Sequence, residues 1–200
     1  MQRTLFSAAL AAALSLAALA PQLARAADGT ITYNGAVTDT TCTVTGGGAA
    51  TGTGDVTVQL PDVSSNILGS AGLTAGKTPF SLVLGGGTNC TDGKTAALWI
   101  ETTQTPALNT ATGALRNQAT SGATNVEVQL INPANDQPID LSVNAVVTSG
   151  STLIAASNQP AATIAGNTAT LNYAAQYLAV EGAASAGVVT TYLTYSMQYN

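Results

Sequence analysis

The sequence contains no histidine. This absence excludes Ser-His-Asp triads, Cys-His dyads, histidine metal sites and histidine pH switches. Charged residues are also scarce, at 8% of the 200 residues, whereas soluble domains carry about 25%. The chain has 5 Lys and Arg against 10 Asp and Glu, so the basic footprint that nucleic-acid binding requires is missing. We therefore expect no nucleic-acid partner.

The chain contains enough apolar residues to form a hydrophobic core. Hydrophobic residues make up 46% of the sequence, which argues against intrinsic disorder. The length suits about one domain, and no tandem repeat of fixed period is visible.

The first 26 residues have the pattern of a secretory signal peptide. Arg3 precedes an apolar run from Leu5 to Ala20, Pro21 ends the run, and Ala24-Arg25-Ala26 forms a small-residue cleavage site. A membrane-spanning helix needs about 20 apolar residues, so we expect cleavage rather than a stable membrane anchor. Residues 27–200 then keep three cations against ten acidic residues, a formal charge of −7.

The two cysteines, Cys42 and Cys90, are predicted to form one disulfide, because an exported protein folds in an oxidising compartment. A thiol nucleophile or a metal site is the alternative. Neither cysteine has a histidine or a C-x-x-C neighbour to support it.

Apolar residues alternate with polar ones in many short runs, a pattern that predicts an antiparallel β-sandwich or barrel. A further strand is expected at Ala96–Glu101, and a turn of helix near Val63–Leu68. The alternating runs are Gly29–Val37, Val56–Leu60, Phe80–Leu84, Val126–Leu130, Leu141–Ala145, Leu171–Ala179 and Val189–Tyr199.

Two stretches rich in small residues, Thr45–Gly54 and Thr105–Gly122, are predicted to be loops, the first of them mobile.

No residue pattern for catalysis stands out. Gly76-Lys77-Thr78 and Gly93-Lys94-Thr95 lack the earlier glycine of a phosphate-binding loop, so we interpret both lysines as ordinary loop residues. Asp136 and Asp140 flank a turn and are interpreted as solvated charges. We expect no enzyme, no catalytic residue, no metal and no cofactor.

The dipeptide Asn34-Gly35 allows two interpretations. Asn-Gly between alternating apolar residues is a strong hairpin signal. One continuous strand is equally compatible, in which Gly35 shares a face with Ile31, Tyr33 and Val37 and marks a close approach to another backbone.

Three stretches resemble the type 1 fimbrial major subunits of chaperone–usher pili. Gly29–Cys42 is similar to the N-terminal extension of that family, and Ala123–Leu130 to a strand in the middle of its domain. At the C-terminus, Gly187 is the fourteenth residue from the end and Tyr199 is penultimate, as in the terminal strand of the family.

This resemblance implies an all-β fold, an incomplete immunoglobulin-like sandwich that a donor strand from a neighbouring subunit completes. It divides the chain into a signal peptide (1–26), a donor-strand extension (27–41) and a pilin domain (42–200). It favours the continuous strand, with Ile31, Tyr33, Gly35 and Val37 entering the groove of the next subunit. The strand contacted by the chaperone would contain Gly187, Val189, Thr191, Leu193, Tyr195, Met197 and Tyr199.

The implied function is that of a structural subunit of an adhesive surface filament. Its partners would be identical or related pilins, a periplasmic chaperone and an outer-membrane usher, and the chain would pass through the periplasm to the cell surface. A minor or adaptor pilin and a tip-associated carbohydrate-binding adhesin are the alternatives. Tip adhesins place a lectin domain before the pilin domain, and the pilin-like pattern here begins directly after residue 26.

Overall fold

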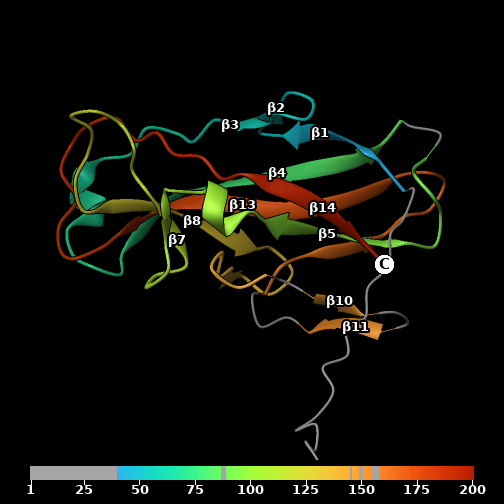
Figure 1. Cartoon of the computed structure of the whole chain (residues 1–200). Coiled ribbons are helices and arrows are strands. Elements are labelled where there is room, and N and C mark those ends of the chain that lie inside the picture. Colours follow the sequence, from blue (N-terminus) through green and yellow to red (C-terminus); the bar gives the residue numbers. More distant parts are fainter. Residues whose placement is uncertain (1–39, 87–88, 145, 149–150, 155–157) are drawn as a thin grey trace, which may run out of the picture. The chain divides into compact units, whose positions relative to one another are not determined.

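The computed structural model describes residues 40–86, 89–144, 146–148, 151–154 and 158–200. Within these ranges the chain is almost entirely β-structure (Figure 1). The strands are β1 (Thr43–Gly48), β2 (Ala50–Thr51), β3 (Thr57–Val58), β4 (Thr74–Gly85), β5 (Thr95–Ile100), β6 (Leu108–Asn109), β7 (Ala114–Arg116), β8 (Val126–Asn132), β9 (Gln137–Pro138), β10 (Val146–Thr148), β11 (Ser151–Ile154), β12 (Ala161–Thr163), β13 (Ala169–Ala179) and β14 (Tyr195–Tyr199). Two short 3-10 helices, η2 (Ser65–Leu68) and η3 (Thr102–Gln104), join them.

Two antiparallel sheets make up the body of the domain. The larger has the order β1-β4-β13-β8-β7-β6, with β9 beside β8, and the smaller has the order β12-β5-β14. Strands β2 and β3 form a separate pair, as do β10 and β11. The antiparallel β-sandwich predicted from the alternating runs is therefore confirmed.

The core lies between the two sheets. Its buried side chains come from both, because alternate residues of a strand face the same side of its sheet. The larger sheet contributes Leu82, Leu84, Val128, Leu130, Leu171 and Tyr173, and the smaller contributes Ala96, Leu98 and Ile100. Phe80 and Tyr173 stack with ring centroids 5.5 Å apart.

The prediction of a mobile loop at Thr45–Gly54 is wrong. Residues 43–48 form β1, which pairs along its length with β4. The chain then turns back on β1, with the Gly46 N–H donating to Gly52 O over 2.9 Å and the Gly54 N–H to Val44 O over 2.8 Å. A Cβ at Gly46 would lie 2.8 Å from the backbone of Ala50. The glycines therefore permit a tight hairpin that covers the edge of the sheet.

Other elements also differ from the expected boundaries. Thr105–Gly122 contains two short strands, β6 and β7, besides its turns, whereas the expected helical turn near Val63–Leu68 is present as η2.

The prediction of a strand at Leu141–Ala145 is wrong for the described residues 141–144. The Asp140 carboxylate accepts from the Ser142 N–H at 2.9 Å and from its hydroxyl at 2.6 Å. An aspartate that accepts from the backbone two residues later stabilises a turn, and the next strand, β10, begins only at Val146.

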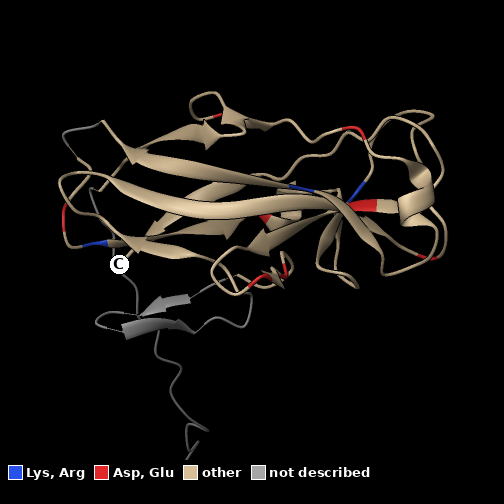
Figure 2. Cartoon of the chain, turned by 180° about the vertical axis from the view of Figure 1, so that it is seen from behind, with Lys and Arg blue, Asp and Glu red and all other residues tan. Residues whose placement is uncertain are grey.

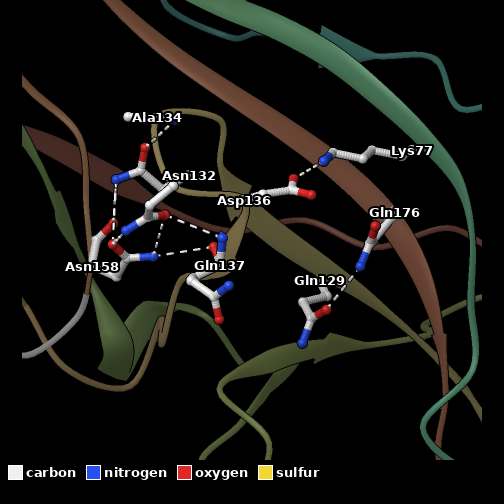
Figure 3. Close-up of polar contacts among 9 residues, drawn as sticks. Lys77, Gln129, Asn132, Ala134, Asp136, Gln137, Asn158 and Gln176 are labelled. Atoms are coloured by element: carbon white, nitrogen blue, oxygen red, sulfur yellow. Dashed lines mark hydrogen bonds and ion pairs between the residues drawn. The ribbon is translucent and has the colours of Figure 1, made fainter.

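Charged residues are few and lie mostly in turns and at strand ends (Figure 2). Lys77 lies within β4, not in the predicted loop, and forms an ion pair with the exposed Asp136 (Figure 3). Beside it, the amide of Asn158 donates to the carbonyls of Gln137 and Pro138. Polar side chains thus tie together the turn at the end of β8.

Candidate functional site: an unfilled groove

A groove of about 470 Å³ opens along one side of the sandwich. One rim is formed by Val56–Leu60, which includes β3, and the other by Val189–Leu193 with Tyr195. The floor consists of core side chains from β4, β5, β7, β8 and β13: Phe80, Leu82, Leu98, Leu115, Val128, Leu130, Tyr173, Ala175 and Tyr177. The groove is therefore an opening into the hydrophobic core.

The groove continues into a second hollow of about 410 Å³. Gln59, Leu60, Tyr177 and Val189 line both parts. The second part is more polar, because Asp62, Ser65 and Ser185 line it.

The pKa values of two tyrosines along the groove reflect this setting. Burial, followed by the negative charge of Asp62, raises the pKa of Tyr177. At the floor, burial raises the pKa of Tyr173.

The C-terminal rim is extended but is a regular strand only from Tyr195 onward, so the prediction of one strand over Val189–Tyr199 is only half correct. The N–H and C=O of Thr190 bond to Asn117 and Gln118, and those of Thr194 bond to Thr105 and Glu101. No hydrogen bond between described residues uses the backbone of Val189, Thr191 or Leu193. Because successive residues of an extended chain bond to opposite sides, this rim is paired on one side only.

The two tyrosines at the C-terminal end bond to segments next to β1 and β2. The Tyr195 hydroxyl donates to Gly54 O over 2.6 Å, and the Tyr199 hydroxyl accepts from the Cys42 N–H over 3.1 Å. Burial, then Asp55 and Tyr199, raise the pKa of Tyr195. Hydrogen bonds thus join β14 to the segments before β1 and after β2.

The predicted disulfide is confirmed. Cys42 and Cys90 are bonded, with their Cα atoms 4.6 Å apart, and Cys90 is fully buried. Closing a loop of this length stabilises a fold by about 4 kcal/mol in the chain-entropy view. The bond fixes the start of β1 to the segment before β5.

The structure describes only some of the other predicted site residues. Ile31, Tyr33, Gly35 and Val37 lie outside the described residues. At the C-terminus, Val189, Leu193, Tyr195, Met197 and Tyr199 pack against the core. Gly187 has φ 155°, and a Cβ there would lie 2.5 Å from Ala123 N, so the backbone just before the rim touches the loop 117–123 directly.

Sequence reasoning did not identify the second rim, Val56–Leu60, or the floor residues as parts of a groove. Their alternation predicted only that they are buried in a sheet. Which sheet edge stays unpaired depends on contacts between distant segments, and the pattern of a single run does not contain this information.

Within the described ranges, no three His, Cys, Asp or Glu side chains cluster closely enough to bind a metal ion. No helix among the described residues is long and apolar enough to span a membrane.

A β-sandwich with an open groove to its core belongs to the class of incomplete immunoglobulin-like domains. The family described as FimA, type-1 fimbrial protein A, matches residues 60–200. The chain belongs to this family and is a fimbrial structural subunit.

Curated fimbrial proteins are similar in sequence to this chain over nearly its whole length. The chain is 41% identical to the major fimbrial subunit SMF-1 of Stenotrophomonas maltophilia, over 92% of this chain and 99% of that protein. It is also 41% identical to the F17 fimbrial protein of Escherichia coli, over 92% of this chain and 94% of the relative. The serotype 2 fimbrial subunit of Bordetella pertussis is 32% identical over 92% of each chain.

Among solved structures, the CupB6 tip adhesin of Pseudomonas aeruginosa has a similar fold. The TM-score is 0.50 at 17% identity, and the match covers 70% of this chain and 34% of the adhesin. This chain therefore spans about a third of the length of that protein.

Proposed function

We propose that this chain polymerises by donor-strand exchange, in which residues 27–41 of one copy fill the groove of the next. The observation that carries the proposal is the rim at Val189–Leu193, which has unpaired backbone groups on one side and lies beside an open path into the core. A strand added there would bond to the rim and cover the floor.

The extension has the composition that such a groove requires. Ile31, Tyr33 and Val37 would fill the groove, and burial of each side chain contributes about 1.5–3 kcal/mol. Gly35 would face a part of the groove too narrow for a side chain. Because the added strand completes a core, the joint should dissociate very slowly.

We further propose a periplasmic chaperone and an outer-membrane usher as assembly partners, with residues 1–26 directing export. An unpaired rim beside exposed core residues promotes aggregation, so a subunit needs a partner that covers the groove before assembly. The role is structural and requires no catalytic step.

The test compares the intact chain with one that lacks residues 27–41, both produced with chaperone and usher. Unheated SDS gels should show a ladder of multimers for the intact chain, which boiling reduces to monomer, and no ladder for the deletion. Monomer alone from both chains would contradict the proposal.

A single substitution tests the donor assignment more sharply. Gly35→Arg should leave the chaperone complex intact but abolish the ladder, because the arginine side chain has no room in the groove. Gly29→Arg, before the apolar positions, is the matched control and should polymerise normally. Normal filaments from Gly35→Arg would exclude residues 27–41 as the donor in this register.

A further inference from the structure

The side-chain amide of Asn117 uses all of its hydrogen-bonding capacity beside the groove. Its nitrogen donates to Ala123 O at 2.9 Å and to Val188 O at 2.8 Å. Its oxygen accepts from the Ala119 N–H at 3.0 Å and the Thr190 N–H at 2.9 Å. An amide has two donor hydrogens and two acceptor lone pairs, so one side chain joins four backbone groups.

These four groups belong to two segments that are far apart in sequence. Ala119 and Ala123 lie in the loop after β7, whereas Thr190 lies in the C-terminal rim and Val188 directly precedes it. Two backbone bonds run alongside, from the Gln118 N–H to Thr190 O at 2.7 Å and from the Ala123 N–H to Val188 O at 3.0 Å. The loop thus holds the rim where no regular strand pairs with it.

The direction of these bonds determines what the rim presents to the groove. Val188 and Thr190 bond toward the loop, so the alternate residues Val189 and Thr191 direct their backbone groups the other way. The Thr191 hydroxyl is buried and has no hydrogen-bond partner among the described residues. A rim fixed on one side loses less conformational freedom when a strand binds on the other.

We propose that Asn117 is a positioning residue that holds residues 188–190 in the extended form that receives the donor strand. This inference rests on the proposed donor-strand exchange and adds to it a residue that need not touch the donor. From the sequence alone, Asn117 is one residue of an expected loop, with no role assigned to it.

The test uses the full chain in complex with its chaperone and a fluorescent peptide of residues 27–41 in excess. Incorporation of the peptide is followed on native gels over time. Asn117→Ala should incorporate it about tenfold more slowly, the effect expected when a fully bonded amide is lost.

Asn132→Ala is the matched control. Asn132 also bonds through both ends of its amide, to Asn158 and to the Ala134 N–H (Figure 3). Neither of these partners lines the groove, whereas the Asn117 partners Ala123, Val188 and Thr190 do. This variant should lose comparable thermal stability and incorporate the peptide within about twofold of the wild-type rate. If both variants incorporated the peptide equally slowly, Asn117 would only stabilise the fold in general, and the proposal would be overturned.

Asn117→Asp gives a readout that depends on the hydrogen bonds themselves. An ionised carboxylate only accepts, so it repels the carbonyls of Ala123 and Val188, whereas the protonated acid regains one donor. Peptide incorporation by this variant should therefore recover as the pH falls toward about 4, while the wild type shows no such recovery.

The outcomes separate the two proposals. If the wild-type complex does not take up the peptide, donor-strand exchange itself fails. If the wild type takes it up and Asn117→Ala does so at the same rate, only the role of Asn117 fails.

Discussion

At the scale of single residues, the groove contains two buried hydroxyls, those of Tyr173 and Thr191, that have no hydrogen-bond partner in the described part of the chain. Tyr173 lies on the floor of the groove and is only 1% exposed. Its buried hydroxyl has no partner among the described residues. An unpaired buried hydroxyl costs about 1–3 kcal/mol. The unpaired hydroxyl therefore lowers the stability of the domain.

Removing that hydroxyl should stabilise the subunit. We expect Tyr173→Phe to raise the free energy of unfolding by up to about 1–3 kcal/mol, measured by denaturant titration of the full chain. Tyr199→Phe is the control, because its hydroxyl accepts from Cys42 and its loss should destabilise. A marked loss of stability in Tyr173→Phe would show that the hydroxyl is satisfied.

The same tyrosines predict how stability depends on pH. The pKa values of Tyr173, Tyr177 and Tyr195 are raised in the fold, whereas an unfolded tyrosine ionises near pH 10. Above that pH the unfolded chain releases protons that the folded chain retains, so the free energy of unfolding should fall. Below it the stabilisation is fully present. Denaturant titrations between pH 8 and 11 should show a fall that is shallower in Tyr173→Phe, and equal slopes would contradict the assignment.

At the scale of elements, side-chain amides take the place of missing strands. Strand β12 pairs with β5 only as far as Ala97. Beyond it, the amide of Asn144 accepts from the Ile100 N–H at 2.6 Å and donates to Ile100 O at 3.0 Å. Asn117 does the same for the C-terminal rim. A short polar side chain can therefore end a sheet without leaving its backbone unsatisfied.

Replacement of Asn144 should weaken this end of the smaller sheet. We expect Asn144→Ala to lower the free energy of unfolding by about 1–3 kcal/mol, since two hydrogen bonds of about 0.5–1.5 kcal/mol each are lost. Hydrogen exchange should show faster exchange of the Ile100 amide. Asn66→Ala, an exposed change in η2, is the control and should do neither.

The sequence predicted those elements whose alternation reflects two-sided pairing. Leu171–Ala179 lies between β4 and β8, and its pattern alone indicated a buried strand. Thr45–Gly54 was misjudged because its pairing with β4 depends on backbone contacts rather than on apolar side chains. Val189–Thr194 has the pattern of a strand. It is not a regular strand in the structure, because no second strand pairs with it among the described residues.

At the scale of the whole molecule, the fold is a sandwich that a single added strand would complete. Asn200 follows β14 directly, and its N–H and C=O are bonded to Thr95. A strand that followed Asn200 through a short turn would run back along β14 antiparallel to it, past the unpaired residues of the rim.

A rearranged chain should therefore become self-sufficient. We expect residues 27–41, moved from the N-terminus to follow Asn200 through a short flexible linker, to give a monomer that folds without chaperone and unfolds at a higher temperature than the chain lacking the extension. Calorimetry and gel filtration measure both. The same rearranged chain with Gly35→Arg should lose the increase in unfolding temperature. If the rearranged chain without this substitution were unstable or aggregated, the groove would not be the acceptor of the donor strand.

The position of the disulfide has a mechanical consequence. In a filament joined by strand exchange, tension enters each subunit where the extension meets the domain, at Cys42. The Cys42–Cys90 bond passes that tension directly to the segment before β5, and β5 is paired with β14, the strand that continues the rim of the next joint. The disulfide path bypasses residues 43–89, which include β1 and β4. In a pulled filament, the covalent bond would therefore carry force to β5 without first unfolding β1 and β4, the two strands of the larger sheet that lie between the cysteines.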